Sequence, residues 1–235
     1  MLDWLTSPID AERAHAISDH IAWHARAMVL SWGGLVPVGI LTARYFKVLP
    51  GQRWPDELDN RLWWNTHRAC QYGAGVIMVA GLWLVMASQG GIAWLHGFLG
   101  WTAVTLAGVQ FVAAWLRGTK GGPTAPAKDG SLRGDHYDMT TRRVVFEYTH
   151  KIAGYLALAC AATAIVVGLW HVNGPRWMWI TLAIWWSGLA VTAMVLQQRG
   201  RAVDTYQAIW GPDPVHPGNR RRPVGLGVTR PKTPD

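Results

Sequence analysis

The stretch that decides the fold is IAGYLALACAATAIVVGLWHV, residues 152–172, in which no side chain carries a formal charge. A helix needs roughly 20 predominantly apolar residues to cross a hydrocarbon core of about 30 Å. Four further runs are comparably long, and Arg26 carries the single formal charge within all five runs. The runs cover residues 22–43, 69–88, 92–116, 152–172 and 177–196. The sequence therefore predicts an all-α integral membrane protein, a helical bundle of five transmembrane helices.

The polar remainder divides the chain into three parts. Residues 1–21 form an N-terminal segment, residues 22–198 the five-helix domain, and residues 199–235 a tail rich in Pro, Gly and Arg. A tail of that composition buries too little apolar surface to fold, so we expect it to be extended. The long polar loop at residues 120–141 contains Pro and Gly that cannot continue a helix. We expect this loop to be irregular.

The net charge of +8 suits nucleic-acid binding at first sight, but the positions of the charges argue against it. Five helices place 19 of the 22 Lys and Arg residues on one side of the membrane. The other three are Arg13, Arg26 and Arg176. Because basic residues collect on the cytoplasmic side, the N-terminus is predicted outside and the C-terminus in the cytoplasm. We expect contact with membrane lipid and no contact with nucleic acid.

Four of the nine histidines stand at the start of an apolar run, one in each of the first four runs. The predicted topology places His24 and His96 near the outer face and His67 and His150 near the inner face. Imidazole is a common iron ligand, and an iron held by two imidazoles has no open position for oxygen. We therefore expect two b-type haems, one on each same-side pair. Covalent attachment is excluded because the chain has no C-x-x-C-H motif.

Features beside these histidines suit a flat, anionic cofactor. Arg26, Arg68 and Lys151 are candidates to bind haem propionates, since an Arg can bind a carboxylate with paired hydrogen bonds. Pro37 is expected to kink the first helix, because proline removes a backbone hydrogen bond. Small residues allow close approach of a helix or a flat ring, although plain helix packing explains most of them equally well. The glycines concerned are Gly33, Gly34, Gly39, Gly73, Gly75, Gly81, Gly97, Gly100, Gly108 and Gly154.

At these residues the sequence resembles the cytochrome b561 family, particularly the membrane domain of its eukaryotic-type and DOMON-associated members. The resemblance covers residues 21–168, and the fifth helix matches only in position. The matching stretches are His24-Ala-Arg-Ala-Met28, Ser31-Trp-Gly33, Pro37-Val-Gly39, His67-Arg-Ala-Cys-Gln71, His96-Gly97, Gln110 and His150-Lys-Ile-Ala-Gly-Tyr155.

The resemblance implies a helical bundle with two b haems, each bound by histidines from alternate helices. Carried over to this chain, the pairs are His24 with His96 and His67 with His150. The compact, Trp-rich chain looks like a bacterial relative. That places it in the cell inner membrane, with its N-terminus in the periplasm.

Three functions remain open from the sequence, and no residue is predicted to be catalytic. The first is a di-haem cytochrome that carries electrons across the membrane between a quinone or soluble carrier and a redox partner. The second is a transmembrane reductase of ferric iron or another small acceptor. The third is a structural or assembly subunit of a larger membrane complex. No oligomeric state is predicted.

Overall fold

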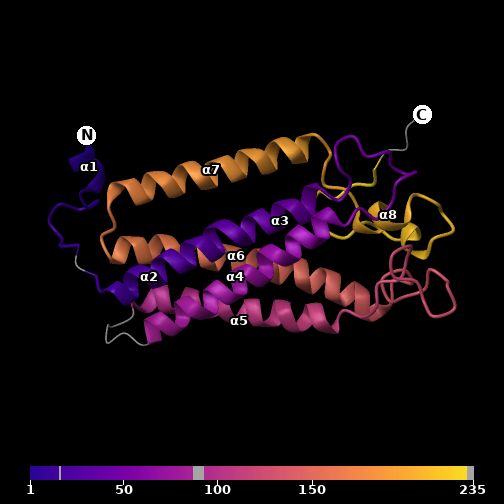
Figure 1. Ribbon diagram of the computed structural model, residues 1–235, viewed down its shortest axis with the longest axis horizontal. Helices are drawn as coiled ribbons and strands as arrows, with labels where there is room; N and C mark the ends of the chain where they lie inside the picture. Colours follow the sequence, from indigo (N-terminus) through magenta and orange to yellow (C-terminus); the bar gives the residue numbers. More distant parts are fainter. Residues whose placement is uncertain (16, 87–92, 232–235) are drawn as a thin grey trace. The chain divides into compact units, whose positions relative to one another are not determined.

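The computed structural model describes residues 1–15, 17–86 and 93–231, which are mainly helical (Figure 1). Five helices in this part of the chain are long and apolar enough to cross a membrane. They are Asp19–Tyr45, Leu62–Met86, Trp94–Leu116, Thr141–His171 and Arg176–Gln198. The predicted all-α architecture with five membrane helices is confirmed.

The elements follow one another in a simple order. They are α1 (Leu2–Thr6), α2 (Asp19–Met28), the π-helix η1 (Val29–Leu35), α3 (Val36–Tyr45), α4 (Leu62–Met86), α5 (Trp94–Leu116), α6 (Thr141–His171), α7 (Arg176–Gln198), α8 (Thr205–Trp210) and the 3₁₀-helix η2 (Pro217–Arg220). The predicted helix end at Ser88, the turn at residues 89–91 and the predicted start at Ile92 lie outside the described residues.

The chain forms two compact units, and every membrane helix contributes one portion to each. The first unit comprises Met1–Gly39, Arg68–Ala107 and Leu156–Ala193. The second comprises Ile40–His67, Gly108–Tyr155 and Met194–Asp235. Each unit holds one of the two predicted histidine pairs.

The first membrane helix is interrupted where the sequence predicts a kink. Pro37 has no N–H, so the carbonyl of Gly33, four residues earlier, loses its helical partner. The turn before this proline is π-helical, over Val29–Leu35. The freed Gly33 carbonyl instead accepts hydrogen bonds from the indole N–H groups of Trp185 and Trp186 on α7, at 2.8 and 3.2 Å. Two tryptophans from another helix thus satisfy the backbone group that the proline leaves free, which lipid could not do.

Two membrane helices begin earlier than their apolar runs predicted. α4 starts at Leu62 rather than residue 69, and α6 starts at Thr141 rather than residue 152. A polar first turn is stabilised on α6 by the Thr140 hydroxyl, which accepts from the Arg143 N–H at 3.4 Å. An apolar run predicts only the part of a helix that lies inside the membrane. A capped polar turn can extend the same helix beyond that part. His67 and His150 therefore lie inside helices rather than at their first residues.

The N-terminal segment is attached to the connection between α6 and α7. The Asn173 side chain donates to the carbonyls of Asp10 and Arg13 at 2.9 and 2.6 Å, and its oxygen accepts from the Asp10 N–H at 3.1 Å. Asn173 itself is buried and has a positive φ of 51°. These contacts agree with the sequence-based assignment of both segments to the same side.

The extended conformation predicted for the tail describes only part of it. Tyr206, Ile209 and Trp210 of α8 are buried and form a small apolar core with Met139. Met139 lies at the end of the loop between α5 and α6, which we call the inner loop. The loop itself is irregular, as predicted, between Leu116 and Thr141. The composition of the tail as a whole is polar. The aromatic and aliphatic side chains of α8 nevertheless give the tail enough apolar surface to fold against the loop.

Candidate functional site

The first histidine pair joins four membrane helices. His24 on α2 and His96 on α5 have ring centroids 6.2 Å apart and ring planes at 82°. Each Nδ1 lies 2.9 Å from a backbone carbonyl oxygen, that of Gly81 on α4 for His24 and that of Ala164 on α6 for His96. A proton on Nδ1 donated to that carbonyl leaves Nε2 with a lone pair. This is the arrangement in which histidine binds a metal ion.

The second pair lies on α4 and α6. The rings of His67 and His150 have centroids 6.3 Å apart and planes at 79°. Phe146 stacks on His150 at 5.1 Å and 27°, and Trp64 lies 6.4 Å from His67, so aromatic rings fix both imidazoles. His150 Nδ1 is buried and has no hydrogen-bond partner within the described ranges. Such an atom suits a ligand that the protein alone does not supply.

The separation within each pair fits coordination of one iron. With histidine–metal bonds of about 2 Å, and each ring centroid about 1 Å behind its nitrogen, two imidazoles on opposite sides of a metal ion have centroids roughly 6 Å apart. The observed separations are 6.2 and 6.3 Å. No group of three or more potential ligand side chains occurs among the residues described. Each pair offers two imidazoles for one iron, and a haem would supply the iron's other ligands.

Glycines allow close packing at two positions beside the first pair. A Cβ at Gly168 on α6 would lie 2.9 Å from Cε1 and Nδ1 of His96, which is too close for a non-bonded contact. A Cβ at Gly81 would lie 2.7 Å from the Met28 side chain, next to the carbonyl that accepts from His24. Sequence reasoning selected Gly81 as one of many small residues and overlooked Gly168. The two carbonyl acceptors were not predictable, since every residue carries a carbonyl.

Similar proteins identify the family to which this geometry belongs. A cytochrome b561, DM13 and DOMON domain-containing protein of Arabidopsis thaliana is 32% identical over 186 residues, 76% of this chain and 18% of that protein. A cytochrome b561 and DOMON domain-containing protein of the same plant is 26% identical over 186 residues, 76% of this chain and 34% of the relative. The chain belongs to the cytochrome b561 family. Ferric-chelate reductase 1 of Mus musculus is 27% identical over 149 residues, 62% of this chain and 22% of the reductase.

This cytochrome b561-family chain spans between about a fifth and a third of the length of these relatives. No family model matches it, and no solved structure is significantly similar to it. The relationships support a multi-pass membrane protein and imply that it binds haem b.

The three cations of this b561-family protein that are predicted to bind haem propionates have different surroundings. The Arg26 guanidinium lies 4.9 Å above the ring of Trp23 and is exposed, and Arg68 is also exposed. Lys151 donates to the Val224 carbonyl at 2.6 Å and to Glu147 at 3.4 Å. The propionate contacts of all three remain predictions.

A buried charged cluster one helical turn from His150 was not predicted. Glu147 on α6 is 7% exposed, and its carboxylate lies 3.2 Å from Arg143, 3.4 Å from Lys151 and 3.2 Å from His136 of the inner loop. Burial, followed by the charge of Arg143, lowers the pKa of His136 to about 4. The spacing of Arg143, Glu147 and Lys151, four residues apart each, was the available signal. The cluster places one buried negative charge between two positive ones, on Arg143 and Lys151, beside His67 and His150.

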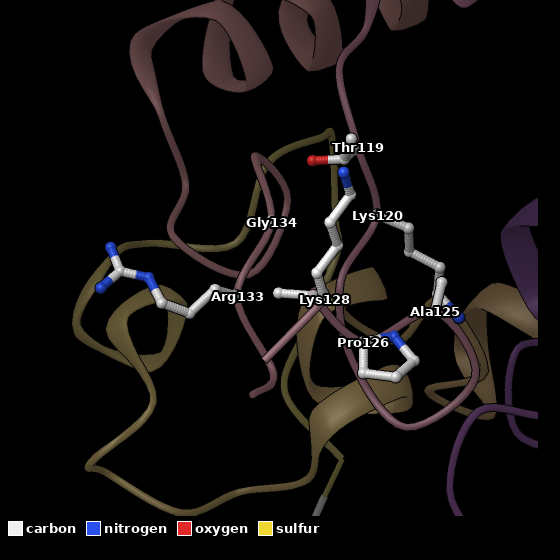
Figure 2. A pocket seen from close by; sticks show the side chains of 8 residues that line it. Thr119, Lys120, Ala125, Pro126, Lys128, Arg133 and Gly134 are labelled. Carbon is white, nitrogen blue, oxygen red and sulfur yellow. The ribbon is translucent and has the colours of Figure 1, made fainter. Parts of the chain in front are cut away.

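The inner loop of this cytochrome also has a hollow of about 570 Å³, lined by Thr119, Lys120, Lys128 and Arg133 among others. Figure 2 shows the Arg133 side chain pointing away from the other labelled side chains. Lys120 forms an ion pair with Asp59 and donates to Thr124 at 2.6 Å. None of the predicted site residues lines this hollow, which belongs to the packing of the loop.

Proposed function

We propose that the chain is a di-haem b-type cytochrome that carries electrons across the membrane between a quinone or soluble carrier and a redox partner. The observation that carries the proposal is the presence of two histidine pairs, each with the spacing of two imidazoles on one iron. Bound haem would supply reversible one-electron chemistry. Two protein ligands per iron leave no open position for oxygen, which favours electron transfer.

The protein's own contribution is to orient the ligands and to adjust their surroundings. The carbonyls of Gly81 and Ala164 hold the rings of His24 and His96 through Nδ1. Such second-shell bonds fix the tautomer and make the coordinating nitrogen more basic. At the other pair, burial and stacking on Phe146 hold the His150 ring. Gln110 donates to the His150 carbonyl at 3.0 Å and thereby ties α5 to α6 at this site.

The distribution of basic residues supports an orientation. With 19 of the 22 Lys and Arg on the connectors of one side, we propose that His67 and His150 serve a cytoplasmic-side haem and His24 and His96 a periplasmic-side haem of an inner-membrane protein. The N-terminus would then be periplasmic and the C-terminus cytoplasmic. A cysteine-labelling experiment on intact cells, with single cysteines in the N-terminal segment and in the tail, tests the orientation.

Haem stoichiometry tests the central proposal. Purified protein is expected to contain two haems per chain by the pyridine haemochrome method. His24→Ala and His96→Ala should each lose the same haem, and His67→Ala should lose the other. The exposed His171 offers a matched control, and His171→Ala should retain both. One haem per chain, or loss of both from every ligand variant, would contradict the di-haem proposal.

A second function is favoured by the similarity to a ferric-chelate reductase, which covers 62% of this chain. As a reductase, the chain would reduce ferric iron or another small acceptor on the side of the membrane where His24 and His96 would hold a haem. Proteoliposomes that contain a reductant inside and a ferric chelate outside distinguish the two. If the external chelate is reduced by the wild type but not by His96→Ala, the reductase function is supported. If protein that contains two haems does not reduce the chelate, the reductase function is excluded.

A further inference from the structure

The tail of the chain provides carbonyl acceptors for cations on two membrane helices. Arg44 at the end of α3 donates through Nη2 to the Leu226 carbonyl at 2.5 Å. Lys151 on α6 donates to the Val224 carbonyl at 2.6 Å. These helix side chains and the tail residues all belong to the second unit. Residues 224–227, which we call the strap, therefore lie across positively charged groups.

A third cation contributes to the same positive region. Lys47 is 7% exposed, and its ammonium donates to the Val203 carbonyl at 3.0 Å. Burial, followed by the positive charge of Lys151, lowers the pKa of Lys47 to about 7, and the charge of Arg44 acts in the same direction. Among the residues that the structure describes, no carboxylate lies within 4.0 Å of Arg44 or Lys47. The acids nearby are Asp204, which partly offsets the charge on Lys47, and Glu147, which pairs with Lys151.

The strap is held mainly by hydrogen bonds, and Val224, which is 7% exposed, is its buried apolar side chain. Leu226 is 80% exposed, so its apolar side chain does not fix the segment. Gln197 on α7 donates to the Gly227 carbonyl at 2.8 Å, and it also accepts from Arg44 at 3.0 Å. A Cβ at Gly227, whose φ is +60°, would lie 2.8 Å from the Gln197 amide nitrogen. Only a glycine lets the backbone approach these donors so closely.

We propose that the strap covers an anion-binding site formed by Arg44, Gln197 and Lys151, and that a carboxylate or phosphate group displaces it. A peptide carbonyl is a neutral acceptor, whereas an anion would add the attraction of opposite charges to hydrogen bonds from the same donors. An anion would therefore satisfy these donors better than the strap does. Residues 225–227 are exposed and bury no apolar side chain, so their local opening costs little free energy. The proposal goes beyond electron transfer and does not depend on the identity of the electron donor.

Binding of inorganic phosphate to the full-length protein tests the site. Phosphate titrations are carried out by calorimetry in phosphatidylcholine nanodiscs. Gly227→Ala should loosen the strap and bind phosphate about tenfold more tightly than the wild type, the change expected for removing one hydrogen bond, here the one that Gln197 donates to the Gly227 carbonyl. Gly130→Ala is the matched control, because its φ of +77° imposes similar strain while its added Cβ meets nothing within 4 Å. It should bind phosphate like the wild type.

Further experiments identify the source of the anion and replace a variant that fails to fold. Arg44→Gln in the Gly227→Ala background should abolish the gain. In phosphatidylglycerol nanodiscs, loss of the gain assigns the site to a lipid headgroup, and its persistence assigns it to a soluble anion. A chain shortened after Pro223 replaces Gly227→Ala if that variant misfolds by circular dichroism. Equal phosphate affinity in wild type and opened variants overturns the proposal, whether or not two haems are present.

Discussion

Replacing Gly168 with alanine should weaken one haem site and leave the other intact. The added Cβ would lie 2.9 Å from Cε1 and Nδ1 of His96. Non-bonded carbon atoms sit about 3.5 to 4.0 Å apart, so the imidazole must move by roughly 0.6 Å or more. Ligand geometry has to be held within about 0.5 Å to function well. The substitution therefore displaces this ligand beyond what its site tolerates.

The size of the effect follows from the hydrogen bond that holds the ring. Movement of His96 away from α6 stretches the 2.9 Å contact between its Nδ1 and the Ala164 carbonyl. Loss of a partner of this kind costs about 10- to 100-fold in metal affinity, which corresponds to about 1.4 to 2.8 kcal/mol. We expect Gly168→Ala to lose the haem of His24 and His96 about 10- to 100-fold faster than the wild type.

Haem transfer to an excess of apomyoglobin, followed at the Soret band, measures this loss for each haem. Gly100→Ala is the matched control on α5, because its added Cβ meets nothing within 4 Å. The control should behave like the wild type. The reasoning is refuted if Gly168→Ala keeps both haems at wild-type rates, or if it releases both haems equally fast.

Three further outcomes are expected from other parts of the molecule. Trp185→Phe removes the donor with the shorter hydrogen bond to the Gly33 carbonyl and should lower the free energy of unfolding by about 1 to 2 kcal/mol. Thermal unfolding measures this change. An unchanged melting temperature would show that the Gly33 carbonyl needs only one donor. His136 has its pKa lowered to about 4 from 6.5, so the unfolded state binds the extra proton between these values and stability falls as pH drops from 6.5 to 4. The free energy of unfolding should fall by about 3 kcal/mol over this pH range in the wild type and by less in His136→Gln. Parallel profiles of unfolding free energy against pH for the two proteins would contradict this. Glu147→Gln removes a buried negative charge one turn from His150 and should raise the midpoint potential of that haem in a redox titration, and a lowered potential would contradict the assigned electrostatics.

Patterns of hydropathy and charge were sufficient to predict the five membrane helices, because a membrane span needs length and apolarity that few other structures need. They could not locate the helix ends. α6 extends through Arg143 and Glu147, where capping and charge pairs at a spacing of four residues replace apolarity. The composition of the tail likewise concealed the aromatic residues of α8, which bury themselves against the inner loop.

The four histidines could be chosen as candidate ligands because histidine is rare in membrane spans and each of them began an apolar run, and their role as ligands stays a prediction. Their supporting groups were not. The acceptors at Gly81 and Ala164 are backbone carbonyls, which leave no trace in residue identity. Gly168 could not be separated from other glycines until its distance to His96 was known. Such groups depend on which helices meet, and that information appears only in the folded chain.

The two histidine pairs have similar spacing but different surroundings, and this difference has a functional consequence. Both Nδ1 atoms of the first pair lie against carbonyls, which makes these histidines more basic ligands and stabilises the oxidised iron. His150 lacks such a partner among the described residues, and Arg143 and Lys151 outnumber the single carboxylate of Glu147 beside it. Nearby positive charge stabilises the reduced, less positive iron. Both effects act in the same direction, so a haem bound by His67 and His150 would have a higher midpoint potential than one bound by His24 and His96, and electrons would rest there at equilibrium.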